Sequence, residues 1–136
     1  MGAWGAGTFD NDAACDWTYG LEGLDDLSLV RKTVANVLEA GSGYLDADIA
    51  CEGLAACEAI ARLKGNWGIR NAYTETLDRW VEKHPANPPA DLVEQALAAI
   101  DRILSPPSEL AELWDETEER NEWRNAVADL RSRVAA

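Results

Sequence analysis

The sequence predicts an all-α fold, in which a single helical domain of about six helices spans residues 1–136 and carries a docked N-terminal segment. Its apolar residues recur at spacings of three and four rather than two, which is the period of an amphipathic helix. Gly and Pro divide the chain into helix-sized lengths, and no stretch has the alternating pattern of a β-strand. With 136 residues the chain is long enough to bury a sizeable core without a disulfide or a metal.

The first two helices are predicted from the short polar residues that precede them. Asp10 or Asn11 caps a helix over residues 12–22, because such side chains accept hydrogen bonds from the exposed N–H groups of a helix start. Asp25 or Asp26 caps the second helix in the same way. The apolar stripe of the second helix is Leu27, Val30, Val34, Val37 and Leu38.

The third predicted helix runs from Asp46 to Gly65 and has an apolar face of unusually small side chains, which lets neighbouring helices come close. Glu52 and Glu58 lie among its Ala, Cys and Gly residues. If the helix is central, one of these carboxylates is partly buried and needs a partner. Arg62 follows Glu58 by four residues, so it lies on the same face and is the expected partner.

Proline marks the limits of the fourth and fifth helices. The fourth covers residues 71–84 and ends before Pro85, because a residue that precedes proline avoids the helical conformation. The fifth follows Pro88 and Pro89 and runs to Leu104, since proline is tolerated where a helix begins.

The last helical stretch is capped by Ser108 and carries two apolar stripes that point roughly 120° apart. We predict one long helix that changes neighbours, because the polar run at 115–122 between the stripes contains no Gly or Pro to break it. The first stripe is Leu110, Leu113, Trp114 and Thr117, and the second is Trp123, Val127, Leu130 and Val134.

The opening seventeen residues contain two Trp, one Phe and three Asp, although a chain terminus normally frays. Burial of Trp4 or Phe9 would contribute roughly 1.5–3 kcal/mol each, so we predict that this segment docks on the bundle. Asp12 or Asp16 is expected to accept a hydrogen bond from the indole N–H of a tryptophan in the segment. The predicted docking motif is Trp4, Phe9, Asp10, Asp12, Asp16 and Trp17.

Acidic residues greatly outnumber basic ones, and the formal net charge is −13. Residues 1–61 carry eleven Asp or Glu against only Arg31 and Lys32. Binding to nucleic acid or to an anionic membrane requires clustered Lys and Arg, so neither is predicted as a partner. A basic protein partner suits this charge, and plain solubility explains it equally well.

The cysteines and the absence of targeting segments predict the compartment. The three cysteines have no CxxC spacing, and Cys51 and Cys57 point in different directions from one helix, so reduced thiols are expected. The N-terminus lacks the pattern of a signal peptide, and no apolar run reaches the ~18 residues of a membrane span. We therefore expect a soluble, cytoplasmic protein.

Patterns for catalysis or metal binding are weak. Asp10, Asp12 and Asp16 offer oxygen ligands, but their spacing does not match a calcium-binding loop, and we interpret them as capping and surface residues. His84 is the only histidine, so the ExxH pairs of di-metal helical bundles are absent. We predict no catalytic residue, no metal site and no cofactor.

Six tryptophans are many for a chain of this length. Trp80 and Trp114 belong to periodic stripes and are predicted to lie in the core. Trp67 lies in a Gly-flanked turn and Trp123 is set apart from the first stripe of the last helix, so both suit interface anchors, and burial under a neighbouring loop is the alternative for each. Either residue would also suit the contact of a homodimer.

Short blocks spread along the chain carry a family resemblance. They are Gly2-Ala3-Trp4-Gly5, Phe9-Asp10-Asn11-Asp12, Asp16-Trp17, Leu54-Ala55-Ala56-Cys57-Glu58 and Ser108-Glu109-Leu110-Ala111-Glu112-Leu113-Trp114. Together they resemble the bacterial domain-of-unknown-function 4259 family over nearly the whole chain. The resemblance implies a cytoplasmic helical domain whose activity is not established, and it assigns no catalytic residue.

These observations lead to one functional prediction and two alternatives. We predict a noncatalytic protein-interaction module that binds a basic partner through an acidic face with one or two Trp anchors. An immunity or antitoxin-like inhibitor is one form of this function. The alternatives are a small carboxylate- or metal-dependent hydrolase and a structural homo-oligomer.

Overall fold

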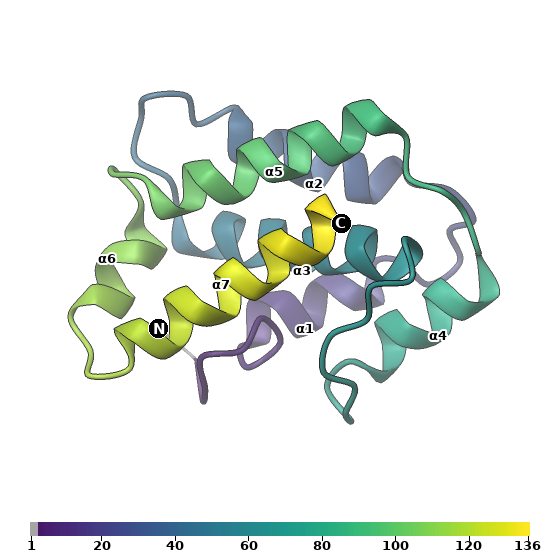
Figure 1. Ribbon diagram of the computed structural model, residues 1–136, viewed down its shortest axis with the longest axis horizontal. Coiled ribbons are helices and arrows are strands. Elements are labelled where there is room, and N and C mark those ends of the chain that lie inside the picture. Colours follow the sequence, from purple (N-terminus) through teal and green to yellow (C-terminus); the bar gives the residue numbers. More distant parts are fainter. Residues whose placement is uncertain (1–2) are drawn as a thin grey trace.

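The computed structural model describes residues 3–136, and its regular elements in this range are all α-helices (Figure 1). The predicted all-α fold is therefore confirmed. Seven helices form, one more than expected, because the last predicted helix is divided in two. They are α1 (Asp12–Tyr19), α2 (Ser28–Leu38), α3 (Ala47–Leu63), α4 (Glu75–Lys83), α5 (Ala90–Leu104), α6 (Glu109–Asp115) and α7 (Arg120–Ala135).

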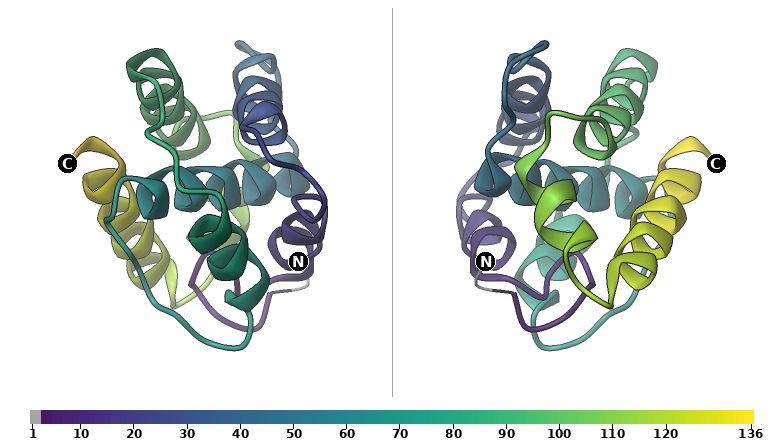
Figure 2. Two further views of the ribbon diagram at one scale, coloured as in Figure 1. Left: turned by 90° about the vertical axis from the view of Figure 1, so that its right-hand side faces the viewer. Right: turned by 90° about the vertical axis from the view of Figure 1, so that its left-hand side faces the viewer.

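Helix α3 is the centre of the fold and contacts every other helix. Helices α2 and α5 lie on one side of it, and α1, α4 and α7 lie on the other (Figure 2). The small residues of α3 make this arrangement possible, and most of the helix between Ala50 and Arg62 is buried. At Gly53 an added Cβ would lie 2.5 Å from Cγ2 of Val37, so α2 crosses α3 too closely for any other residue at this position.

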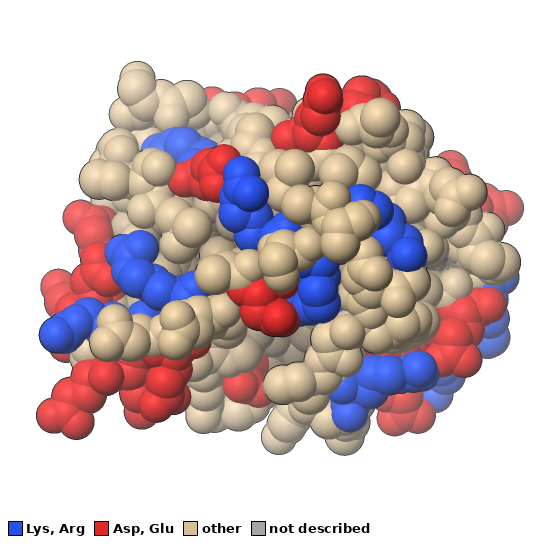
Figure 3. Space-filling view, viewed as in Figure 1, with Lys and Arg blue, Asp and Glu red and all other residues tan. Residues whose placement is uncertain are grey.

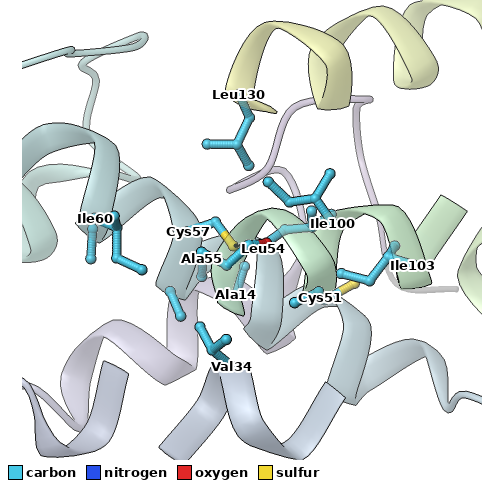
Figure 4. Packing of buried hydrophobic residues seen from close by; sticks show 14 of the residues in the cluster. Ala14, Val34, Cys51, Leu54, Ala55, Cys57, Ile60, Ile100, Ile103 and Leu130 are labelled. Atoms are coloured by element: carbon cyan, nitrogen blue, oxygen red, sulfur yellow. Dashed lines mark hydrogen bonds between the residues drawn. The ribbon is translucent and has the colours of Figure 1, made fainter. Parts of the chain in front are cut away.

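Aliphatic side chains fill the space between α3 and its neighbours. Figure 4 shows Leu54 and Cys57 of α3 among Val34 of α2, Ile100 of α5 and Leu130 of α7. All five side chains are buried. The removal of such apolar surface from water is the main favourable contribution to folding.

Polar caps set the starts of several helices as predicted. Asn11, Asp46 and Ser108 each accept a hydrogen bond from a backbone N–H in the first turn of α1, α3 and α6. At α2 the cap differs from the prediction. Asp26 accepts a hydrogen bond from the N–H of Ser28 at 3.0 Å, but the residue between them occupies the cap position and makes no side-chain bond.

Helices α1 and α4 are shorter than predicted. The chain turns after Tyr19 instead of continuing to residue 22, and α4 begins at Glu75 instead of residue 71. Before α4, Oδ1 of Asn71 accepts a hydrogen bond from the N–H of Tyr73 at 2.9 Å, so a side chain takes the place of a helical backbone partner. Among the helices of residues 3–136, none is long and apolar enough to cross a membrane.

The prediction of one long C-terminal helix is wrong, because the chain turns between α6 and α7. Thr117 makes the turn: its hydroxyl donates to the carbonyl of Trp114 at 2.7 Å and accepts from the N–H of Glu119 at 3.2 Å. The turn brings the rings of Trp114 and Trp123 into a stack with centroids 6.3 Å apart. Both apolar stripes therefore face the same core, which a straight helix could not achieve.

The N-terminal segment, residues 3–11, is docked as predicted. It folds back on itself, because the N–H of Trp4 donates to the carbonyl of Asp10 at 2.8 Å and the N–H of Gly7 donates to the Asp10 carboxylate at 3.0 Å. Phe9 is buried at 6% exposure. Trp4 is 50% exposed and packs on the ring of Tyr73 at 5.2 Å between centroids.

Candidate functional site

A hollow lies between the N-terminal segment, the end of α3, the segment that follows α3, and α7. We call it the α3–α7 cavity, and its volume is about 530 Å³. This size falls within the range of small-molecule binding sites. Its lining residues are Gly7, Thr8, Phe9, Asp10, Glu58, Arg62, Ile69, Asn71, Thr74, Glu122, Asn125, Ala126, Asp129 and Arg133.

A network of buried charges forms the floor of the α3–α7 cavity. Arg62 of α3 pairs with Glu58 one turn earlier and, through Nε, with Asp78 of α4 at 2.8 Å. Arg133 of α7 pairs with the same Glu58 carboxylate. The side chains of Arg62, Glu58 and Asp78 are only 1%, 5% and 6% exposed, so these charges depend on one another rather than on water.

Further hydrogen bonds complete the network. The hydroxyl of Thr74 donates to Asp78 at 2.7 Å, and Nη2 of Arg62 donates to the carbonyl of Ile69 at 2.6 Å. The Arg62 guanidinium also lies between the rings of Phe9 and Trp67, at 5.9 and 5.7 Å from their centroids. Within residues 3–136 no buried side-chain nitrogen or oxygen lacks a hydrogen-bond partner.

The network joins segments that are far apart in the sequence. Arg62 connects the end of α3 with α4 and with the chain after α3 through hydrogen bonds, and it contacts the N-terminal segment through the Phe9 ring. Arg133 connects α7 with the same network through Glu58. The carboxylates of Glu58 and Asp78 are both bound by arginine. Both carboxylates therefore already have partners within the fold.

Glu52 lies apart from this network, although the sequence paired it with Glu58 as a candidate buried carboxylate. It is half-buried near the start of α3. Burial raises the pKa of its carboxyl group, and the neighbouring charges of Asp48 and Asp46 raise it further. Glu52 belongs to a different surface.

We call that surface the α3–α6 acidic surface, because α6 lies beside the beginning of α3. The contact is direct: the N–H of Ala47 donates to Oε1 of Glu109 at 2.8 Å. Within residues 3–136 none of its carboxylates is paired with Lys or Arg in a salt bridge. The residues that define it are Asp46, Asp48, Glu52, Glu109, Glu112 and Glu116.

Two large apolar side chains are exposed on the α3–α6 acidic surface, Tyr44 at 60% and Ile49 at 37%. A hydrogen bond to Glu112 is the main reason that the pKa of the Tyr44 phenol rises to about 12, with smaller contributions from burial and from the charges of Glu112, Glu109 and Glu116. The surface thus combines negative charge with an aromatic side chain, and both are features of protein interfaces.

The two tryptophans predicted as interface anchors lie in different surroundings. Trp67 is half-buried in the turn after α3, where the guanidinium of Arg70 packs on its ring at 4.3 Å. Trp123 is only 3% exposed and stacks on Trp114 inside the bundle, so it offers no contact surface. Its stripe seemed separate only because the sequence does not reveal the turn at Thr117.

Asp10 of the N-terminal segment has a structural partner. Asp10 closes the segment onto Gly7, and an added Cβ at Gly5 or Gly7 would lie 2.5 or 2.8 Å from the Asp10 carboxylate. The expected bond from Trp17 to an aspartate is wrong, because the Trp17 indole donates to the hydroxyl of Thr33 at 2.8 Å. Residues 3–136 contain no group of three or more His, Cys, Asp or Glu that could hold a metal ion.

The three thiols are held in their neutral form. Burial raises the pKa of Cys57 far above its usual range and that of Cys51 to about 12. Cys15 is half-buried, its S–H donates to the carbonyl of Phe9 at 3.2 Å, and burial and nearby aspartates raise its pKa as well. A thiolate nucleophile needs the opposite environment.

Several residues of the α3–α7 cavity were not identified from the sequence. Arg133 and Glu122 lie on α7 and reach the cavity only through the packing of this helix against α3, and Asp78 of α4 joins the network beneath it through Arg62. The sequence signal that did exist was local, the Glu58 and Arg62 spacing within one helix. No spacing pattern links residues of α3 with residues of α7.

Comparison with known proteins gives one match. The sequence matches the family described as Domain of unknown function (DUF4259) over residues 2–126, which is most of its length. No curated protein and no solved structure matches the chain. The match agrees with the resemblance carried by the N-terminal and α3 blocks, and the chain belongs to the domain-of-unknown-function 4259 family.

Proposed function

We propose that this protein is a noncatalytic interaction module that binds a basic protein partner through the α3–α6 acidic surface. The observation that carries the proposal is the gathering of unpaired carboxylates around the exposed ring of Tyr44. Elsewhere many acidic side chains are paired with arginine, as in Asp101 with Arg131. The carboxylates of the α3–α6 acidic surface are free to pair with a basic partner.

The partner is a protein whose contact surface carries Lys or Arg around an apolar patch. Complementary charge accelerates association and selects the partner, while a buried aromatic residue supplies affinity. An immunity or antitoxin-like inhibitor of a basic protein is one concrete form. The apolar contacts in this proposal are Tyr44 and Ile49, which are exposed. Trp123, which the sequence predicted as an anchor, is buried.

The alternatives receive less support. For a hydrolase, the most buried carboxylate that lines the α3–α7 cavity, Glu58, is already bound by two arginines. A homodimer through the α3–α6 acidic surface would bring like charges together. A homodimer through Trp67 stays a separate proposal, which the mass in solution would test.

The test compares two variants with the same change in net charge. One replaces three carboxylates of the surface (Asp48→Asn, Glu112→Gln, Glu116→Gln), and its matched control replaces three exposed carboxylates elsewhere (Asp25→Asn, Glu94→Gln, Glu118→Gln). Tagged proteins are used to capture partners from a lysate of the source cells at low and moderate salt, and the captured proteins are identified by mass spectrometry.

We expect the wild type and the control to retain the same basic protein at low salt, and the surface variant to lose it. Moderate salt should weaken capture by the wild type, because exposed charges are screened. Equal capture by the surface variant and the control would overturn the proposal, and so would a partner that is retained unchanged at moderate salt.

A further inference from the structure

We propose that the α3–α7 cavity binds an organic cation, a protonated amine or guanidine attached to an apolar body. This inference goes beyond the proposed function. The cavity lies at the end of α3 and beside α7, whereas the α3–α6 acidic surface lies at the beginning of α3. Either proposal can fail without the other.

The charges of the two cavity arginines are already compensated within the protein. In Arg62, Nε donates to Asp78, Nη1 to Glu58 and Nη2 to the carbonyl of Ile69. In Arg133, Nε donates to Asp129, Nη1 to Glu58 and Nη2 to Glu58. Every guanidinium nitrogen therefore already has an acceptor within the protein, and both positive charges are compensated by carboxylates of the fold.

Carboxylates, in contrast, remain in excess. Four of them line the cavity, against two guanidinium groups. Within residues 3–136 neither Asp10 nor Glu122 forms an ion pair, and the only hydrogen bond to the Asp10 carboxylate comes from the N–H of Gly7. The cavity therefore has a net negative lining, and a cation entering it would gain partners without displacing any.

Carboxylates of α7 line one wall of the cavity. Acidic and basic side chains adjoin one another on the face of the molecule that α7 crosses (Figure 3). The carboxylates of Glu122 and Asp129 both belong to α7 and are two helical turns apart along it, so they line one wall of the cavity. Asp10 faces them from the N-terminal segment.

The apolar part of the lining gives the ligand its second property. Phe9, Ile69 and Ala126 line the cavity, and Ile69 is 78% exposed, which is unusual for a large aliphatic side chain. A bound apolar group would cover Ile69. Small-molecule sites commonly combine such apolar walls with a few polar groups that orient the ligand.

The first experiment is an NMR titration of the isotopically labelled protein with small probes. The cationic probes are 2-phenylethylamine, agmatine and spermidine, and the controls for 2-phenylethylamine are neutral 2-phenylethanol and anionic phenylacetate. We expect at least one amine to shift the amide signals of Thr8, Ile69 and Asn125. For 2-phenylethylamine, the neutral analogue should bind about tenfold more weakly, which corresponds to the loss of one charge interaction.

Variants then locate the interaction. Glu122→Gln and Asp10→Asn keep the shape of each side chain, and Asn at position 10 can still accept the hydrogen bond from Gly7. Each should weaken amine binding about fivefold. The control Glu118→Gln removes one exposed charge from the loop before α7, outside the cavity, and should leave the affinity unchanged. Thermal unfolding of each variant checks that the fold is intact.

The same titration with a tri-arginine peptide distinguishes the two sources of the cation. Tighter binding of the peptide at the same signals would show that a protein side chain supplies it, and binding of the free amines alone would indicate a small molecule. The proposal is overturned if no amine binds below about 10 mM, a very weak affinity. It is equally overturned if the neutral and anionic controls bind as well as the amine, or if Glu118→Gln weakens binding as much as Glu122→Gln.

Discussion

At the scale of single residues, Glu58 is a buried carboxylate that two arginines share. Its carboxylate accepts hydrogen bonds from both Arg62 and Arg133, and it is 95% hidden from solvent. A buried ion pair adds little stability compared with an apolar pair of the same shape, but removal of one partner leaves the other charge buried without compensation. Glu58 serves two arginines, so its loss affects both.

We expect Glu58→Gln to lower the free energy of unfolding by about 3–5 kcal/mol, because two guanidinium groups then share only the remaining carboxylates. Urea unfolding followed by circular dichroism measures this change. Glu118→Gln is the matched control, since it removes an exposed charge and should change stability by less than about 0.5 kcal/mol. A similar small loss for both variants would mean that water reaches Glu58.

The pH dependence of Tyr44 is a second prediction at this scale. Its pKa in the folded protein, about 12, lies above its ordinary value of 10.0, chiefly through Glu112. The phenol therefore favours the folded state fully below the pKa of the unfolded chain, and this contribution is lost as the pH rises through the folded pKa. An ultraviolet titration of the wild type minus Tyr44→Phe isolates this phenol. Glu112→Gln should shift its midpoint down towards 10.0.

At the scale of the helices, the crossing of α2 and α3 depends on Gly53. A Cβ at this position would lie 2.5 Å from Cγ2 of Val37 and 3.6 Å from Cδ1 of Ile103. Contacts of the first kind do not occur in folded proteins, so α2 would have to move away. A glycine within a helix is normally a weakness, and here close packing outweighs it.

We expect Gly53→Ala to destabilise the protein by about 1–3 kcal/mol despite the better helix propensity of alanine. Val37→Ala removes the obstructing methyl group, so in that background Gly53→Ala should be neutral or stabilising. A double-mutant cycle of thermal or urea unfolding measures the coupling between the two sites. Additive effects of the two substitutions would show that α2 does not press on Gly53.

The helices also show where sequence reasoning succeeds. The caps at Asn11 and Ser108, the apolar stripe of α2, and the pairing of Glu58 with Arg62 all depend on residues within a few positions of one another. Local spacing is sufficient for such features. The turn after α6 was missed because Thr117 replaces helical bonds with its own hydroxyl, and a threonine in a polar run gives no clear stop signal.

The site was harder to predict than the helices. Its charged floor combines residues of α3, α4 and α7, and the distance along the chain between Glu58 and Arg133 is 75 residues. Asp78 looked like any other exposed acid of an amphipathic helix, but the end of α3 covers it. Only the three-dimensional packing distinguishes these charges from those on the surface.

At the scale of the whole molecule, the net charge of −13 acts on the folded state as a weak self-repulsion. Salt bridges on the surface offset part of it, but most of them involve side chains that are at least 40% exposed, such as Arg31 with Asp91. Such pairs contribute little. The buried network of Glu58 and Arg62 is shielded from solvent, so added salt should hardly change it.

We therefore expect added salt to stabilise the protein. Between about 0.01 and 0.1 M NaCl the screening length falls from about 30 to about 10 Å, which weakens repulsion between distant carboxylates more than it weakens close ion pairs. The midpoint of thermal unfolding should rise across this range. A falling midpoint would mean that surface salt bridges outweigh the repulsion. Potassium chloride serves as the control for ion-specific effects.

The pairing of α7 with the middle of the chain also bears on biosynthesis. A ribosome makes Glu58 long before it makes Arg133, and chains begin to fold from the N-terminal side during synthesis. Until α7 emerges, the nascent chain can bring α3 and α4 together, but the Glu58 carboxylate then faces the gap that α7 later covers. The complete network of Glu58, Arg62 and Arg133 can therefore form only after α7 has been made.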